Sequence, residues 1–133
     1  MGEQKKITGV LVKKDKASIV SVADKLEEYY KLLGCSLIEI VDRRIAPDHT
    51  KKLFSIVCDE EGLCKNEPRI SAISSFGEID LVGDLFITGA SKNGHLTSLE
   101  ADDADEILKA CRMIPTERHP EGIMILTKCD QLM

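Results

Sequence analysis

The chain has 133 residues, the length of one domain, which is enough to bury a hydrophobic core without disulfide bonds. Aromatic residues make up only 4% of it and tryptophan is absent, so the core must be aliphatic, built from Ile, Leu and Val. Its formal net charge of −5 argues against binding to a nucleic-acid backbone, because such proteins carry a surplus of Lys and Arg on one face.

The cysteines and the hydropathy pattern indicate a cytoplasmic protein. No apolar run approaches the ~20 residues of a membrane span, and no signal-peptide pattern is present, so we expect no membrane association. The cysteine count of five is odd and includes no Cys-x-x-Cys pair, which favours free, mostly buried thiols in a reducing compartment. Cys58 and Cys64 could ligate zinc, but their spacing matches no common zinc motif. We predict no metal and no cofactor.

The first third of the chain predicts a β-hairpin followed by a helix. Residues 7–12 and 17–20 form the two strands, separated by a charged turn. Ser21 and Asp24 have the spacing of a capping box at the start of the helix, and Gly34 ends it as a C′ glycine does. Apolar side chains recur on one face of this helix at helical spacing: Val22, Leu26, Tyr29, Tyr30 and Leu33.

The middle of the chain predicts three strands, over residues 37–41, 53–58 and 80–88. The last of these is almost continuously apolar, which indicates a central position in the sheet. Gly83 within it indicates a bulge or a close backbone approach. Residues 67–75 predict either a short helix or an irregular crossing.

The last third predicts a turn, a second helix and a final strand. Asn93-Gly94 is a strong hairpin signal, and Thr97 with Glu100 has the spacing of a capping box. Pro115 stops the helix, and residues 123–127 form the strand. The inner face of the helix is expected to carry Leu99, Ala104, Ile107, Leu108 and Cys111.

These elements predict one α+β domain over residues 1–133, with the order ββαββ(α)βαβ. Its sheet is mixed but mainly antiparallel, with both helices packed on one face. Residues 114–133 are expected to be a C-terminal extension that contains one strand.

Basic residues in predicted loops and at strand ends are the candidate ligand-binding residues. Arg43-Arg44 could hold a carboxylate or phosphate through bidentate hydrogen bonds. The stretch 89–94 superficially resembles a phosphate-binding loop, but His95 and Leu96 stand where Lys and Ser or Thr would be required, which favours a surface turn. A small anion could still contact this turn. The full candidate set is Arg43, Arg44, Arg69, Lys92 and His95.

Asp59, Glu60 and Glu61 form a cluster of carboxylates in a predicted turn. Consecutive residues in a turn point in different directions, so at most two could converge on one metal ion. We predict that they contact a protein partner or water. No serine stands in a Gly-x-Ser-x-Gly setting, and we predict no catalytic residue.

Several segments of the chain together match the pattern of a known family. They are 59–63, 68, 70–73, 81–87 and 98–99, together with the first strand and helix, Gly34 and the strand 38–41. In these segments the chain resembles the domain-of-unknown-function family three-eight-four-six, found in bacteriophages and clostridial mobile elements. The resemblance covers about residues 7 to 113, and residues 114–133 lie outside it. It implies a viral or mobile-element origin and the cytoplasm of a bacterial host, and it supplies no established catalytic residue.

Three functions remain open, since a fold alone does not fix function. The first is a non-enzymatic module in a homo-oligomer that sequesters a small anionic ligand, such as a nucleotide-derived immune signal, and thereby counters host defence. The second is an inhibitor or adaptor that binds a host protein through its acidic residues, 59–61 and 102–106. The third is a small nucleotide hydrolase with Asp59, Glu61 and a histidine around a metal.

Overall fold

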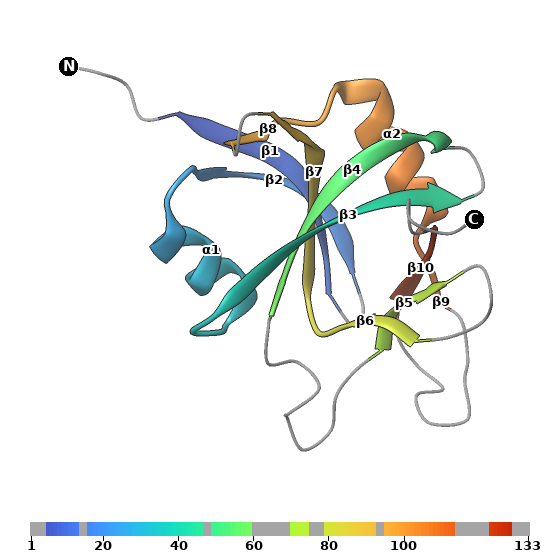
Figure 1. Cartoon of the computed structure of the whole chain (residues 1–133), viewed down its shortest axis with the longest axis horizontal. Helices are drawn as coiled ribbons and strands as arrows, with labels where there is room; N and C mark the ends of the chain where they lie inside the picture. Colours follow the sequence, from blue (N-terminus) through green and yellow to red (C-terminus); the bar gives the residue numbers. More distant parts are fainter. Residues whose placement is uncertain are drawn as a thin grey trace.

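A computed structural model describes residues 5–13, 16–46, 49–59, 70–74, 79–92, 95–113 and 123–128. Within these ranges the chain forms one curved sheet and two helices (Figure 1). The helices are α1 (Leu26–Leu33) and α2 (Ala101–Ala110). The strands are β1 (Lys6–Val12), β2 (Ala17–Ala23), β3 (Ile38–Ala46), β4 (His49–Asp59), β5 (Ile70–Ser74), β6 (Ile79–Val82), β7 (Leu85–Lys92), β8 (His95–Thr97), β9 (Arg112–Met113) and β10 (Ile123–Lys128).

The sheet has the order β2-β1-β7-β4-β3-β10-β5-β6, with β8 paired to β7 and β9 paired to β10. All of these pairs are antiparallel except that of β10 with β5. The predicted α+β class and the mixed, mainly antiparallel sheet are therefore confirmed. The last strand of the chain lies inside the sheet, between β3 and β5.

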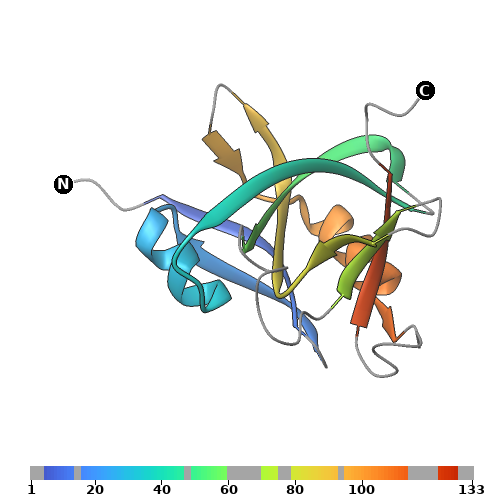
Figure 2. The ribbon, with the colours of Figure 1, turned by 60° about the horizontal axis from the view of Figure 1, so that its bottom comes forward.

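The two helices pack on opposite faces of the central strands, so the prediction that they share one face is wrong. Ile56 and Ile87 belong to a core with α2, whereas their neighbours Val57 and Phe86 belong to a core with α1. Successive side chains of a strand point to opposite faces, which makes these two cores the two sides of one sheet. The long strands β3 and β4 curve around the α2 side (Figures 1 and 2).

The chain bends sharply at Gly83, which has φ +83° and separates β6 from β7. The predicted single strand over residues 80–88 is thus two strands, because β6 pairs with β5 whereas β7 pairs with β1 and β4. The described part of the predicted helix or crossing at 67–75, Ile70–Ser74, is strand β5. Its pairing with β10 and β6 is a long-range effect that local propensity does not report.

Neither predicted capping box forms. The hydroxyl groups of Ser21 and Thr8 lie 2.7 Å apart across the β1–β2 pair, and α1 starts later, with Lys25 as N-cap. Thr97 donates its hydroxyl to the Ala90 carbonyl, 2.8 Å away. Cross-strand hydrogen bonds therefore hold both hydroxyl groups. The predicted C-terminal glycine of the first helix is confirmed, since Gly34 has φ +63°.

The predicted hairpin after β7 is confirmed by the pairing of Lys92 with His95. The inner face of α2 also agrees with the prediction. Leu99, Ala104 and Ile107 are buried in the core, and Leu108 and Cys111 pack against it. No helix among the described residues is long and apolar enough to cross a membrane.

Candidate functional site

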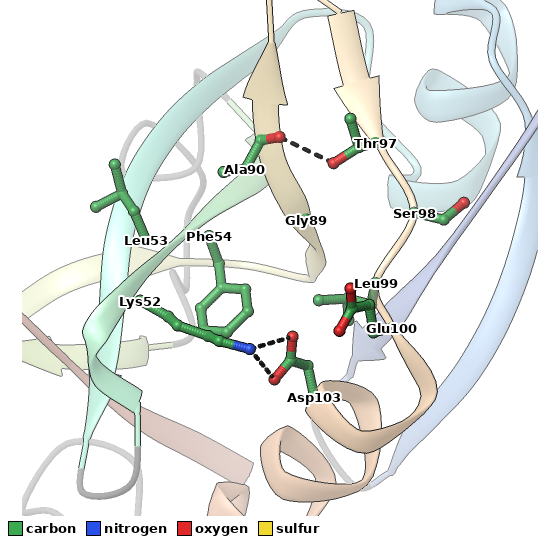
Figure 3. A pocket seen from close by; sticks show the side chains of 10 residues that line it. All are labelled: Lys52, Leu53, Phe54, Gly89, Ala90, Thr97, Ser98, Leu99, Glu100 and Asp103. Atoms are coloured by element: carbon green, nitrogen blue, oxygen red, sulfur yellow. Dashed lines mark hydrogen bonds and ion pairs between the residues drawn. The ribbon is translucent and has the colours of Figure 1, made fainter.

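A pocket of about 210 Å³ opens where the N-terminal end of α2 meets strands β4, β7 and β8 (Figure 3). The lining residues come from segments that are distant in the chain, because β4 forms one wall of the pocket and the start of α2 forms the wall opposite. Ten residues line it: Lys52, Leu53, Phe54, Gly89, Ala90, Thr97, Ser98, Leu99, Glu100 and Asp103.

Gly89 allows β8 and the segment after it to lie close against β7 at this pocket. A Cβ atom on residue 89 would lie 2.5 Å from the Thr97 Oγ1 and 2.8 Å from the Ser98 carbonyl oxygen. Real Cβ atoms do not approach other atoms so closely, so any side chain here would push β8 away. The glycine is therefore a requirement of the pocket's geometry, and its φ is not in the left-handed region.

An ion pair between Lys52 and Asp103 crosses the pocket (Figure 3). The Lys52 Nζ lies 3.0 Å from Oδ1 and 3.1 Å from Oδ2 of Asp103. The Asp103 side chain is only 13% exposed, whereas that of Lys52 is 55% exposed. The hydrogen bond to Asp103 raises the pKa of Lys52, so this amine stays protonated at neutral pH. The pair thus holds a protonated amine at the opening of the pocket, with its charge offset by Asp103.

The remaining walls combine apolar surface with a second hydrogen-bond donor. Phe54 and Leu99 are 2% and 7% exposed and form the apolar part. The Ser98 Oγ accepts the Thr8 N–H at 2.9 Å, which leaves the Ser98 hydroxyl hydrogen able to donate to another group. An ammonium group has three N–H donors, so Lys52 can bond Asp103 and a ligand together. Glu100 adds a carboxylate to the lining.

Two of the predicted ligand-binding residues lie beyond the pocket's end, and two lie one strand away from it. Lys92 and His95 are paired at the end of the β7–β8 hairpin, two residues beyond Thr97. Arg43 pairs in register with Phe54, and its Nη1 donates to the Asp42 carbonyl at 2.9 Å. Arg44 pairs with Lys128 of β10. Strand β4 separates the arginines from the hairpin, so the structure does not gather these residues into one site.

Arg69, Glu60 and Glu61 lie outside the described residues. Asp59 ends β4 and is 8% exposed, so its carboxylate is largely withdrawn from solvent. Their predicted roles in binding a ligand or a protein stay predictions.

Sequence reasoning missed Lys52 and Asp103. Lys52 stood in a predicted loop, and Asp103 stood among acidic residues that suit the start of any helix. The two residues are 51 positions apart, and no local pattern connects them. Only the approach of α2 to β4 shows that they form a pair.

Among the described residues, no three His, Cys, Asp or Glu side chains lie close enough together to hold a metal ion. Cys35, Cys58 and Cys111 carry thiols rather than disulfide bonds. Cys58 is buried, and burial raises the pKa of Cys111 to about 11. A high pKa makes a thiol a poor nucleophile at neutral pH.

A family model for a domain of unknown function, DUF3846, matches residues 7–112 of the chain. No curated protein and no solved structure gives a significant match. The match covers most of the chain and includes β4, β7, β8 and α2, the elements that line the pocket. The chain therefore belongs to the DUF3846 family.

Proposed function

We propose that this member of the DUF3846 family is a non-enzymatic binding module that holds a small ligand with a singly charged anionic group in the Lys52 pocket. The observation that carries the proposal is the Lys52–Asp103 pair, which holds a protonated amine beside the apolar wall of Phe54 and Leu99. Small-molecule sites likewise combine apolar surface with a few polar groups that orient the ligand.

The charges of the lining restrict the ligand. Lys52 is the cationic side chain of the lining, and Glu100 and Asp103 are its anionic ones. Because Asp103 offsets the charge of Lys52 and Glu100 adds a further carboxylate, a polyphosphate would be repelled much more strongly than a group with a single negative charge. A single phosphodiester or carboxylate could bond the free N–H donors of Lys52. Hydroxyl or amino groups of the same ligand could then donate to Glu100.

The volume restricts the ligand further. About 210 Å³ is less than the roughly 300–1,000 Å³ of pockets that enclose drug-sized molecules. Only part of a nucleotide would fit, with the rest extending over the rim. A cyclic nucleotide signal has the required single charge per phosphodiester together with donor groups. In the proposed setting, a phage or mobile element in a bacterial cytoplasm, its capture would counter host defence.

The test is a capture experiment with a panel of cyclic mononucleotides and dinucleotides and their linear products. The protein is incubated with the panel, filtered and heat-denatured, and the released compounds are identified by mass spectrometry. We expect one compound to be released intact, and Lys52→Met to abolish its capture. The matched control is Lys31→Met, which removes an exposed lysine that also pairs with a carboxylate, Glu28 at 3.6 Å.

A third variant separates binding from folding, because Lys52→Met leaves Asp103 without this cation. Asp103→Asn keeps Lys52 and removes the competing charge, so it should retain or strengthen capture. If every compound stays unchanged in the filtrate, or if Lys52→Met captures as well as the control, the proposal is wrong.

The protein-binding alternative is less well supported by the acidic residues the structure describes. Asp102 and Asp105 are exposed on α2, but Asp103 is bonded to Lys52 and Asp59 is buried. Among the described residues, the exposed part of the predicted acidic surface therefore lies on α2, whereas Glu60 and Glu61 lie outside the described residues. A host-lysate pull-down that enriches one protein, and loses it in Asp102→Asn/Asp105→Asn, would favour this alternative.

A further inference from the structure

Strand β2 forms one end of the sheet, and its sequence lacks the features that usually protect an edge. Its only strand neighbour among the described residues is β1, with which all seven of its residues pair. An edge strand presents unpaired N–H and C=O groups to a second chain, and natural proteins discourage such pairing with Lys or Pro. The segment Ala17–Ala23 reads ASIVSVA and contains neither a charge nor a proline.

One large apolar side chain of this strand faces solvent beside an exposed serine, Ser21. Ile19 is 46% exposed, one of the few large hydrophobic residues of the described chain that face solvent to this extent. Val20 and Val22, on the other face, are held by the core beneath α1. The strand is thus fixed in place, and no described strand pairs with its outer edge.

From this edge we infer that the protein forms a symmetric homodimer in which β2 pairs antiparallel with β2 of a second copy. The backbone limits the registers that such a dimer can adopt. Along a strand, every second residue directs its N–H and C=O groups toward the outer edge. In an antiparallel pair, two residues that face each other both direct these groups into the pair or both direct them away from it. In two copies of the same strand, the numbers of two facing residues are therefore both odd or both even. The two-fold axis of the dimer therefore passes beside one residue, which faces the same residue of the second copy.

A register centred on Val20 satisfies both the backbone and the charges. It pairs all of β2, with Ala17 facing Ala23 of the second copy. One position further at each end, Lys16 faces Asp24 of the second copy. Lys16 is exposed, and Asp24 is held in place by the Tyr29 hydroxyl, which donates to its Oδ1 at 2.7 Å. Each end of the pairing then carries one ion pair, and no like charges face each other.

The same register covers the exposed apolar side chain. Ile19 faces Ser21 of the second copy and lies diagonal to the second copy's Ile19. Diagonal neighbours in an antiparallel pair are about 7–8 Å apart, within reach of long side chains. The two isoleucines would therefore cover each other across the axis. This inference does not depend on the proposed ligand pocket.

The first test measures the mass of the full chain in solution by light scattering coupled to size exclusion. We expect a dimer for the natural sequence, a monomer for Ile19→Lys and a dimer for the matched control Ile19→Thr. Ile19→Lys introduces the charge that edge strands use against pairing, at a half-exposed position. Circular dichroism checks that both variants are folded.

The second test examines the register through charge reversal. Lys16→Asp alone and Asp24→Lys alone each place like charges opposite each other at both ends of the pairing. Each should raise the dimer dissociation constant about tenfold, which is the scale of two exposed ion pairs turned repulsive. An equal mixture of the two variants restores opposite charges at both ends, so native mass spectrometry should show the mixed dimer in excess over either homodimer.

A monomeric natural protein at high micromolar concentration would overturn the inference. So would a dimer that survives Ile19→Lys, because its interface would lie elsewhere. The third outcome concerns the register alone. If Ile19→Lys breaks the dimer but the Lys16→Asp and Asp24→Lys variants show no preference for the mixed dimer, the register centred on Val20 is wrong.

Discussion

The two helices differ in how much of the sheet they hold together, although they pack on opposite faces of the same central strands. The core around α2 contains residues from both halves of the sheet, such as Val10 of β1 and Ile125 of β10. Of the described side chains, those buried in the core around α1 belong to the helix itself and to β1, β4, β7 and β8, with Ile7, Val57 and Leu96 among them. A sheet that curves around one helix places many strands within reach of it. The α2 side is therefore the one that joins the two halves of the fold.

Truncation in each core should show this difference most strongly. Ile107→Ala on α2 removes a fully buried side chain and should lower the free energy of unfolding by about 4 kcal/mol. Leu33→Ala on α1, where the side chain is 6% exposed, should cost about 2 kcal/mol. Urea denaturation followed by circular dichroism measures both. Equal losses would contradict a joining role for α2.

Gly89→Ala tests the wall shared by β7 and β8. The added methyl group meets the Thr97 hydroxyl and the Ser98 carbonyl, so overpacking should cost about 2 kcal/mol and displace β8. Gly34→Ala is the matched control, because its Cβ would meet nothing within 4 Å and only its left-handed backbone is strained, at about 1 kcal/mol. Urea denaturation of both variants gives these values. A Gly34 variant less stable than the Gly89 variant would show that β8 moves away at little cost.

Cys111, which packs against the α2 core, should make the protein less stable at alkaline pH. Burial raises the pKa of its thiol to about 11 in the folded state, so the folded chain keeps a proton that the unfolded chain releases. The stabilisation is complete below the unfolded pKa of about 8.5 and falls as the pH rises toward 11, by about 1–2 kcal/mol. Denaturation under reducing conditions at several pH values measures it. Cys111→Ala should reduce this slope, and an unchanged slope would assign the effect to other groups.

Tyr29→Phe should have the smallest effect, on the α1 side. It removes the hydrogen bond to Asp24 but keeps the ring, whose centroid lies 6.2 Å from that of Phe86. The expected cost is about 1 kcal/mol. Burial and Asp24 both raise the pKa of Tyr29, so its phenol stays protonated in the range of these measurements. Tyr29→Leu is the control that also removes the ring contact, and it should cost more. Equal costs would mean that the hydrogen bond, not the ring, accounts for the contribution of Tyr29.

Local patterns in the sequence determined most of the elements of this protein. The αL cap at Gly34, the Lys92–His95 hairpin and the apolar face of α2 each depend on residues close together in the chain. The sequence also indicates locally that both faces of the sheet are covered, because three consecutive apolar residues are all fully buried: Leu85, Phe86 and Ile87. Such a run indicates a strand covered on both sides.

The tertiary structure alone decided which face each helix covers, how Gly83 divides one apolar run between two pairings, and where the pocket lies. The capping-box patterns failed because Ser21 and Thr97 found partners across strands, which the spacing of residues along the chain does not report. Lys52 and Asp103 have no pattern of their own, and their pairing depends on the packing of α2 against β4. Contacts between distant segments follow from how the whole sheet curves, so a pattern read along the chain does not contain them.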